Sequence, residues 1–294
     1  MLFRSKIWTD DFNIPESGNG IPDLLDEIKF ELDWLIRMQD DDGGAFIKLG
    51  TLDYDPPSPI PSKDTRPRYY GPKCSSSTIA IASMFAHAAV EMQAIPELED
   101  YAAELTSRAR SAWDWFQNNP VETDCDTGEI KAGDADMKAE PQLGTTVSAA
   151  VYLFAATGDP KYSDYVVENI ALAQPYRDGP WSRYDPWQGD ALIFYSQLPD
   201  ADSAITEKIL TNLEDKLIEY HPEDYGNDDV LDPFRSHMPD AQYHWGSNMT
   251  KANYGSMNYD PVMLGIHEAE SPAYIERALR SEERRVGKEC RSRW

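Results

Sequence analysis

Several aromatic residues of this chain lie beside carboxylate and amide residues in polar stretches, a combination suited to holding a sugar. Trp181, Asp185 and Trp187 occur in the segment WSRYDPWQGD, and Trp245 precedes Asn248 by three residues. Sugars present flat C–H faces that stack on aromatic rings, while carboxylates and amides hydrogen-bond their hydroxyls. These five are candidate substrate-binding residues. The alternatives are plain packing for each tryptophan and capping of the following helix for Asn248.

A second candidate is the pair Tyr69 and Tyr70, which follows one aspartate and two arginines. The segment reads DTRPRYYGP and places Asp64, Arg66 and Arg68 just before the two rings. Arginine pairs well with carboxylate, so this loop could be a structural Arg–Asp network. It could equally present its tyrosines to a sugar. The sequence leaves both interpretations open.

Two acidic clusters raise the question of a metal, because calcium takes oxygen ligands from such loops. Each cluster brackets a glycine-containing turn; they are Asp124, Asp126, Asp134 and Asp136, and Asp224, Asp228, Asp229 and Asp232. The spacing does not fit the EF-hand loop, and 52 acidic residues produce clusters by chance. Solvated surface is therefore the favoured interpretation, calcium is the alternative, and no other cofactor is expected. The five histidines lack zinc spacing, and His87 in an alanine-rich stretch indicates a core or helix-contact residue.

Composition indicates a folded, acidic chain. Of 294 residues, 41% are hydrophobic, and 8 Trp, 16 Tyr and 9 Phe exclude general disorder. No run approaches the ~18 apolar residues of a membrane-spanning helix. A net charge of −25 argues against nucleic acid or an anionic membrane surface as partner.

Apolar residues recur every three to four positions, which predicts an all-α protein built from helix pairs. The expected helices cover residues 23–39, 76–94, 97–118, 143–157, 160–170, 188–198, 202–220, 249–267 and 272–279. The serine run at 75–77 should supply the N-cap of the second helix, and Gly158-Asp159-Pro160 should end one helix and start another. Long polar segments at 40–74, 121–142, 174–187 and 221–247 separate the pairs, so we expect a toroid of helices with its loops gathered around a site.

The two ends differ from the rest of the chain. Residues 280–294 carry six basic and three acidic residues without apolar periodicity. The codons AGA TCG GAA GAG encode Arg-Ser-Glu-Glu, and their reverse complement encodes the Leu-Phe-Arg-Ser of residues 2–5. We therefore predict that residues 1–5 and 280–294 are translated sequencing adapter, and that 6–279 is a partial domain. Only Cys74 and Cys125 then remain, and their spacing leaves open whether they pair.

Several motifs resemble family 9 glycoside hydrolases. Residues 13–27 (NIPESGNGIPDLLDE) and the helix ELDWLIRMQ before Gly43-Gly44 are the most specific, and DTRPRYYGP, AATGDPKY, WGSN and Ala252-Asn253 follow in the family's order. The similarity covers essentially residues 10–268. It implies an incomplete (α/α)6 barrel from a secreted or periplasmic enzyme that hydrolyses β-1,4-linked glucan or a related polysaccharide with inversion.

The resemblance also shows what the chain lacks. The family's catalytic base lies in an Asp-Ala-Gly-Asp motif before the NIPESG stretch, and its general acid is a glutamate near the end of the barrel; neither motif occurs here. Inverting hydrolysis needs both carboxyl groups, so this chain alone should be inactive. Ile47 occupies a position where the family often has a histidine, which puts a preference for plain cellulose in doubt. The alternatives are a non-catalytic glycan-binding module on the same fold and an acidic helical scaffold.

Overall fold

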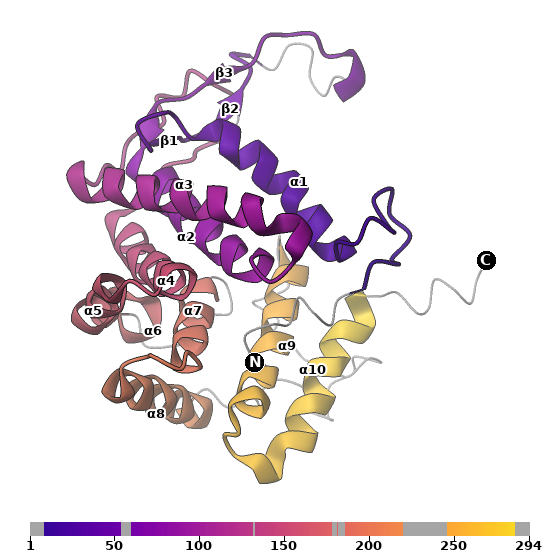
Figure 1. Cartoon of the computed structure of the whole chain (residues 1–294), viewed down its shortest axis with the longest axis vertical. Coiled ribbons are helices and arrows are strands. Elements are labelled where there is room, and N and C mark those ends of the chain that lie inside the picture. Colours follow the sequence, from indigo (N-terminus) through magenta and orange to yellow (C-terminus); the bar gives the residue numbers. More distant parts are fainter. Residues whose placement is uncertain are drawn as a thin grey trace. The chain divides into compact units, whose positions relative to one another are not determined.

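The computed structural model describes residues 9–53, 60–131, 133–177, 181, 186–219 and 246–285. Backbone contacts divide the chain into two compact units, residues 1–173 with 197–200, and residues 174–196 with 201–294. Helices make up most of both units, and the short strands lie in the first (Figure 1). Within these described ranges, no helix combines the length and the apolar character that crossing a bilayer requires.

The first unit is a group of helices with two short strand pairs. The helices are α1 (Asp23–Met38), α2 (Ser75–Met92), α3 (Glu99–Asn118), α4 (Ala139–Thr157) and α5 (Pro160–Asn169), joined by the 3-10 turns η2 (Pro61–Lys63), η3 (Pro96–Leu98) and η4 (Ile170–Leu172). The strands are β1 (Ala45–Phe46), β2 (Leu49–Gly50), β3 (Tyr69–Tyr70) and β4 (Lys73–Cys74), with β1 antiparallel to β4 and β2 antiparallel to β3. The helices confirm the all-α class.

The core of this unit lies around α2, which packs against both α3 and α4 (Figure 1). Ile79, Ala82 and Phe85 of α2 and Val147 and Val151 of α4 have no exposed surface. Helices α2 and α4 bury apolar residues on most sides rather than on one stripe, as expected for helices covered by neighbours on several faces. Small side chains, mostly alanine, allow this close approach.

Helix α3 shows the predicted apolar stripe. Ala102, Leu105, Ala109, Ala112, Trp113 and Phe116 are buried along one face. The indole of Trp113 meets the rings of Tyr162 and Tyr165 of α5 edge-on, with ring centroids 5.6 Å and 4.9 Å apart. Edge-to-face contacts of this kind add to the stabilisation from area burial. They fix α5 beside α3.

The turn between α4 and α5 forms as the sequence predicts. Gly158 adopts the left-handed conformation (φ 66°) that glycine tolerates best, and its N–H bonds the Phe154 carbonyl. The Asp159 carboxylate then accepts the backbone N–H of Lys161 at 3.1 Å, and Pro160 occupies the first turn of α5. Helix α4 itself begins at Ala139, four residues earlier than expected.

The serine run has a different role from the one predicted. The N-cap of α2 is Cys74, and no side-chain hydrogen bond caps this end. The Ser77 hydroxyl instead contacts the carbonyls of Ala45 (2.8 Å) and Cys74 (3.0 Å), and Thr78 donates to the Cys74 carbonyl at 2.7 Å. Since Thr78 also accepts the Ala45 N–H, these hydroxyls attach β1 to the start of α2.

Helix α1 buries only part of its apolar face. Leu25, Leu32 and Met38 are buried, but Leu24 and Ile28 remain 37% exposed. On another side Phe30 is 77% exposed and Trp34 41% exposed. Within the first unit, much of α1 is therefore open to solvent.

The helices described in the second unit are α6 (Gln174–Arg177), α7 (Trp187–Ser196), α8 (Ser203–Glu219), α9 (Ser247–Leu264) and α10 (Ser271–Arg285), with the 3-10 turn η7 (Glu268–Glu270). Of these, α7 to α10 start close to the predicted ranges, whereas the short α6 lies in the segment 174–187 that was expected to be a loop. The predicted stripe of α8 is confirmed at Ile205, Ile209 and Leu213, which are buried. Helix α10 continues past the boundary predicted at residue 280, and the origin of the segment beyond it stays a prediction.

Candidate functional site

The β2–β3 pair presents two tyrosine rings to solvent. Leu49 lies opposite Tyr70 and Gly50 opposite Tyr69, and the two tyrosines are 49% and 44% exposed, respectively. The Tyr70 ring also packs on Phe46, with centroids 4.6 Å apart and planes tilted by 32°. Each phenol therefore combines an accessible ring with a hydroxyl that can exchange hydrogen bonds, which are the two requirements for holding a sugar.

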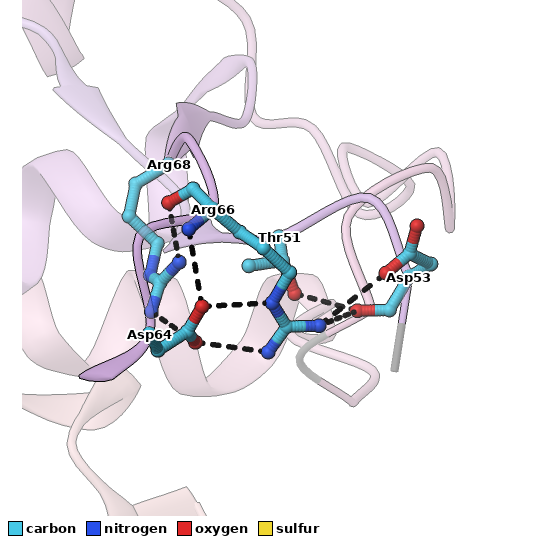
Figure 2. A network of polar contacts seen from close by, with 5 residues as sticks. All are labelled: Thr51, Asp53, Asp64, Arg66 and Arg68. Carbon is cyan, nitrogen blue, oxygen red and sulfur yellow. Dashed lines mark hydrogen bonds and ion pairs between the residues drawn. The ribbon is translucent and has the colours of Figure 1, made fainter. Parts of the chain in front are cut away.

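An ionic network fixes the segment that leads into β3 (Figure 2). The carboxylate of Asp64, 6% exposed, accepts two hydrogen bonds from the Arg66 guanidinium at 2.9 Å and one from Arg68 at 2.7 Å. The Arg66 guanidinium also donates a hydrogen bond to the Asp53 carbonyl at 3.2 Å. The same carbonyl accepts a hydrogen bond from the Thr51 hydroxyl at 2.7 Å. The Arg–Asp network is thus confirmed, and it joins the two arms of the loop between β2 and β3.

The charges of this network exclude it from acid catalysis. The hydrogen bonds from Arg66 hold the pKa of Asp64 far below its usual range, and Asp64 in turn raises the pKa of Arg66. Asp64 is therefore ionised at neutral pH and has no proton to donate to a leaving group. Its role is to position the tyrosine strand.

The loop between α3 and α4 is held by the first acidic cluster. Asp136 accepts the backbone N–H groups of Cys125 at 2.7 Å and Asp126 at 2.8 Å, and Asp134 accepts that of Asp136 at 3.0 Å. Asp126 pairs with Lys48, whose ammonium lowers the pKa of this carboxyl group. These carboxylates stabilise the loop backbone. Among the described residues no group of three or more His, Cys, Asp or Glu is arranged to hold a metal ion.

The second acidic cluster, Asp224 to Asp232, lies outside the described residues, so its role stays a prediction.

Cys74 and Cys125 form a disulfide, which resolves the question that their spacing left open. Their Cα atoms are 5.9 Å apart, and both residues are buried. The bond joins the end of β4 to the loop between α3 and α4. The loop is thus covalently tied to β4, three residues after the tyrosines of β3.

Gly43 and Gly44 lie where the backbone passes against α3. A Cβ on Gly43 would meet the Ser111 carbonyl oxygen at 2.4 Å, and one on Gly44 would meet the Trp115 ring at 2.7 Å. Gly43 also has a φ of 96°, which disfavours any other residue. The same close packing recurs at Ile47, whose side chain lies 3.0 Å from the Cβ position of Gly71.

The two tryptophans of the second unit differ in exposure. Trp181 is only 7% exposed, donates its indole N–H to Asn212 at 2.9 Å, and packs so closely on Gly189 that a Cβ there would lie 2.5 Å from its ring. This environment favours the packing interpretation. Trp187 is the first residue of α7 and is 50% exposed, so its ring is available for stacking. A sugar contact stays a prediction for both.

Asn248 lies in the first turn of α9 and is exposed. The N-cap of this helix is Gly246 and no side-chain hydrogen bond caps it, so the capping interpretation of Asn248 is wrong. Its contact with a sugar stays a prediction. Asp185 and Trp245 lie outside the described residues.

Comparison of the sequence with known protein families assigns the chain to one of them. The family model described as glycosyl hydrolase family 9 matches residues 8–259. The chain belongs to glycosyl hydrolase family 9. The residues on which the sequence resemblance rests, from the NIPESG stretch to the start of α9, all lie inside the matched range.

Two curated relatives of this family 9 chain are endoglucanases. Endoglucanase D of Acetivibrio thermocellus is 26% identical over 162 residues, 54% of this chain and 25% of that protein. A xyloglucan-specific endo-beta-1,4-glucanase of Bacteroides ovatus is 32% identical over 122 residues, 40% of this chain and 20% of that protein. The chain thus spans a quarter or less of the length of these two relatives.

A solved structure supports the fold. The family 9 chain aligns with a metagenome-derived family 9 endoglucanase with a TM-score of 0.72 and 25% identity, over 94% of this chain and 48% of that one. Since family 9 catalytic domains are (α/α)6 barrels, the predicted fold type is confirmed. The alignment covers about half of that protein's length.

Sequence reasoning missed an ion pair near the site of this family 9 chain, between the buried side chains of Lys48 and Asp126. The two residues are 78 positions apart, and Lys48 directly follows Ile47 in the sequence. A lysine between apolar residues, facing a loop rich in aspartate, was the available signal. It carried no information about which aspartate would be the partner.

Proposed function

We propose that the chain is part of a glycoside hydrolase acting on β-1,4-linked glucan or a related plant-type polysaccharide, and that Tyr69 and Tyr70 contact the glycan. The observation that carries this proposal is the exposed tyrosine pair, on a strand fixed by an ionic network, in a family 9 chain. Aromatic rings lose little conformational entropy on binding, and a fixed strand loses still less. Successive side chains of a strand point to opposite faces, so the fixed strand offers one exposed ring on each face to a neutral polymer.

The reaction that we propose for the whole protein is hydrolysis with inversion. It requires one carboxylic acid to protonate the leaving oxygen and one carboxylate to activate water, roughly 6.5–9.5 Å apart. The sequence contains no Asp-Ala-Gly-Asp motif, and the carboxylate of Asp64 stays ionised in its arginine network. We therefore expect this chain alone to bind glycan without hydrolysing it.

Glycan preference is expected to depend in part on Ile47. Its apolar side chain cannot hydrogen-bond a sugar hydroxyl, whereas the histidine frequent at this position in the family can. We therefore expect no advantage of plain cello-oligosaccharides over xyloglucan oligosaccharides. Restoring histidine with Ile47→His should shift the ratio of the two affinities toward cello-oligosaccharides.

The test is calorimetric titration of the full chain with both oligosaccharides. Tyr69→Ala combined with Tyr70→Ala should weaken binding by about tenfold or more, since each stacked ring contributes on the order of 1 kcal/mol. Phe30→Ala is the matched control, because it removes an exposed aromatic ring from α1 of the same unit. Equal affinities in both variants and the parent chain would contradict the assignment of the tyrosines.

Hydrolysis is tested separately by measuring reducing sugar. Release by the chain alone would contradict the expected inactivity. If the protein extended at both ends also binds without hydrolysis, the non-catalytic glycan-binding module becomes the better description.

We further propose that the protein works outside the cytoplasm. The support is the Cys74–Cys125 disulfide, because such bonds persist in oxidising compartments. Protein recovered from the medium or periplasm of the native host should contain no free thiol at these positions. Reduced cysteines in native protein would argue against an oxidising location.

A further inference from the structure

The loop of residues 122–137, here called the strap, is closed at its base by one side chain. The Gln142 amide donates to the carbonyls of Glu122 and Met137, both at 2.8 Å. The Glu122 N–H bonds the Ser75 hydroxyl at 2.8 Å, and that hydroxyl lies 2.6 Å from the Gln142 amide oxygen. The strap thus has the closed ends of an Ω-loop, and its described residues, 122–131 and 133–137, form no helix or strand.

Two neighbouring residues attach the strap to the tyrosine-bearing segment. Cys125 forms the disulfide with Cys74, and Asp126 forms the ion pair with Lys48. The Lys48 ammonium also donates to the Gly133 carbonyl at 2.9 Å, so it bridges both arms of the strap. One link is covalent and the other is ionic, and they lie side by side.

The strap is also hydrogen-bonded to the chain next to β2, and its partner Lys48 is bonded to the chain next to β3. The backbone N–H of Lys131 donates to the Thr51 carbonyl at 2.9 Å, directly after β2. The Lys48 carbonyl accepts the Gly71 N–H at 2.8 Å, directly after β3. Movement of the strap would therefore disturb the chain directly after β2, and through Lys48 it would reach the end of β3.

Both links are shielded from water. Cys74 is 1% and Cys125 4% exposed, and the paired Lys48 and Asp126 side chains are 9% and 4% exposed. A reductant in solution cannot reach either sulfur in this conformation, because thiol–disulfide exchange needs direct approach of a thiolate. The strap must open first, and opening separates Lys48 from Asp126.

We propose that the Lys48–Asp126 pair is a latch that controls access to the Cys74–Cys125 disulfide. When the pair opens, the thiolate of a small dithiol attacks one sulfur and forms a mixed disulfide, releasing the other as a cysteine thiol. The second dithiol sulfur then displaces the remaining cysteine. Two electrons and two protons pass to the cysteines, and the dithiol becomes a cyclic disulfide. The inference is independent of glycan binding.

The experiment measures how fast dithiothreitol reduces the disulfide in the folded full chain, by maleimide labelling of new thiols at neutral pH. Asp126→Asn and Lys48→Met should each accelerate reduction by about tenfold or more, because each leaves a buried charge without its partner. The matched control is Asp124→Asn, which makes the same charge change next to Cys125 at an exposed side chain. It should leave the rate unchanged within about twofold.

Equal rates in the parent chain and in both latch variants would overturn the proposal, and so would equal acceleration by Asp124→Asn. If the latch variants do not fold, the urea dependence of the parent chain's reduction rate decides. Opening of the strap alone exposes little surface, so its rate should rise only weakly with urea below the unfolding transition. A steep rise matching the global unfolding transition would show that the disulfide opens only when the whole protein unfolds, and would overturn the latch.

Discussion

The inner helices and the tyrosine-bearing segment of the first unit are stabilised in opposite ways. Helices α2 and α4 are held by apolar side chains with no exposed surface, such as Phe85 and Val151. Strands β2 and β3 are two residues long and bury little, so backbone hydrogen bonds and the ion pairs of the neighbouring segments hold them, and a disulfide fixes the adjacent β4. Non-directional packing suits a core, whereas directional bonds hold exposed rings at a surface where burial would hide them.

The largest effect is expected from a cavity in the helical core. Phe85→Ala should lower the free energy of unfolding by about 3–5 kcal/mol, because the ring is fully buried and its neighbours cannot collapse completely. Chemical denaturation measures the loss. Met84→Ala, next to it on the same helix but 44% exposed, should cost under about 1 kcal/mol. Similar losses at the two positions would contradict the core assigned to α2.

Breaking the disulfide should have the next largest effect. Replacing Cys74 and Cys125 together by serine should lower the free energy of unfolding by about 2–4 kcal/mol, since the unfolded chain gains conformational freedom. Thermal unfolding of the double variant beside the parent chain measures this. Protease cleavage after Lys131 should also become faster, because the strap loses one of its two links. An unchanged melting temperature with unchanged cleavage would contradict the comparison.

A smaller, pH-dependent effect is expected at His87. Its ring stacks on Tyr152 of α4 with centroids 4.1 Å apart, and desolvation by the surrounding protein lowers its pKa to about 4, even though the residue as a whole is exposed to solvent. The unfolded chain therefore takes up a proton at His87 near pH 6.5 and the folded chain only near pH 4. The contribution of the neutral His87 ring to the free energy of unfolding is therefore fully present above pH 6.5 and is lost as the pH falls toward 4.

This pH dependence is measured as the difference between the parent chain and His87→Gln. The two stability curves should converge between pH 6.5 and 4, since the carboxylates common to both cancel. Parallel curves over this range would show that His87 is equally accessible to protons in the folded and unfolded chains.

The smallest effect on global stability is expected from the network around Asp64. Arg66→Lys keeps the charge but loses the paired hydrogen bonds, so global unfolding should change little. Protease cleavage after Lys63 should nevertheless become faster, because the loop loses its link to Asp53. Arg108→Lys, which affects an exposed pair within α3, is the control and should leave that cleavage unchanged. A large drop in melting temperature would mean that this segment belongs to the core.

Exposure of the candidate site residues could not be read from the sequence. Trp181 and Trp187 have the same side chain six positions apart, yet one is buried on Gly189 and the other begins α7 half-exposed. Exposure depends on what packs above a residue, and nothing near either tryptophan encodes that. The tyrosine pair was found because two rings follow a charged loop, but its fixed geometry depends on Arg66 reaching Asp53.

The sequence by itself determined the longer helices, the turn at Gly158 and the family. Helix periodicity, caps and turn residues depend on neighbours within about four positions, and motifs such as NIPESG are contiguous. Only the tertiary structure decided that Cys74 pairs with Cys125, 51 residues away, and Lys48 with Asp126, 78 residues away. Such contacts form when burial of the core brings distant segments together. In the unfolded chain each of these residues has many alternative partners, and the fold selects one of them.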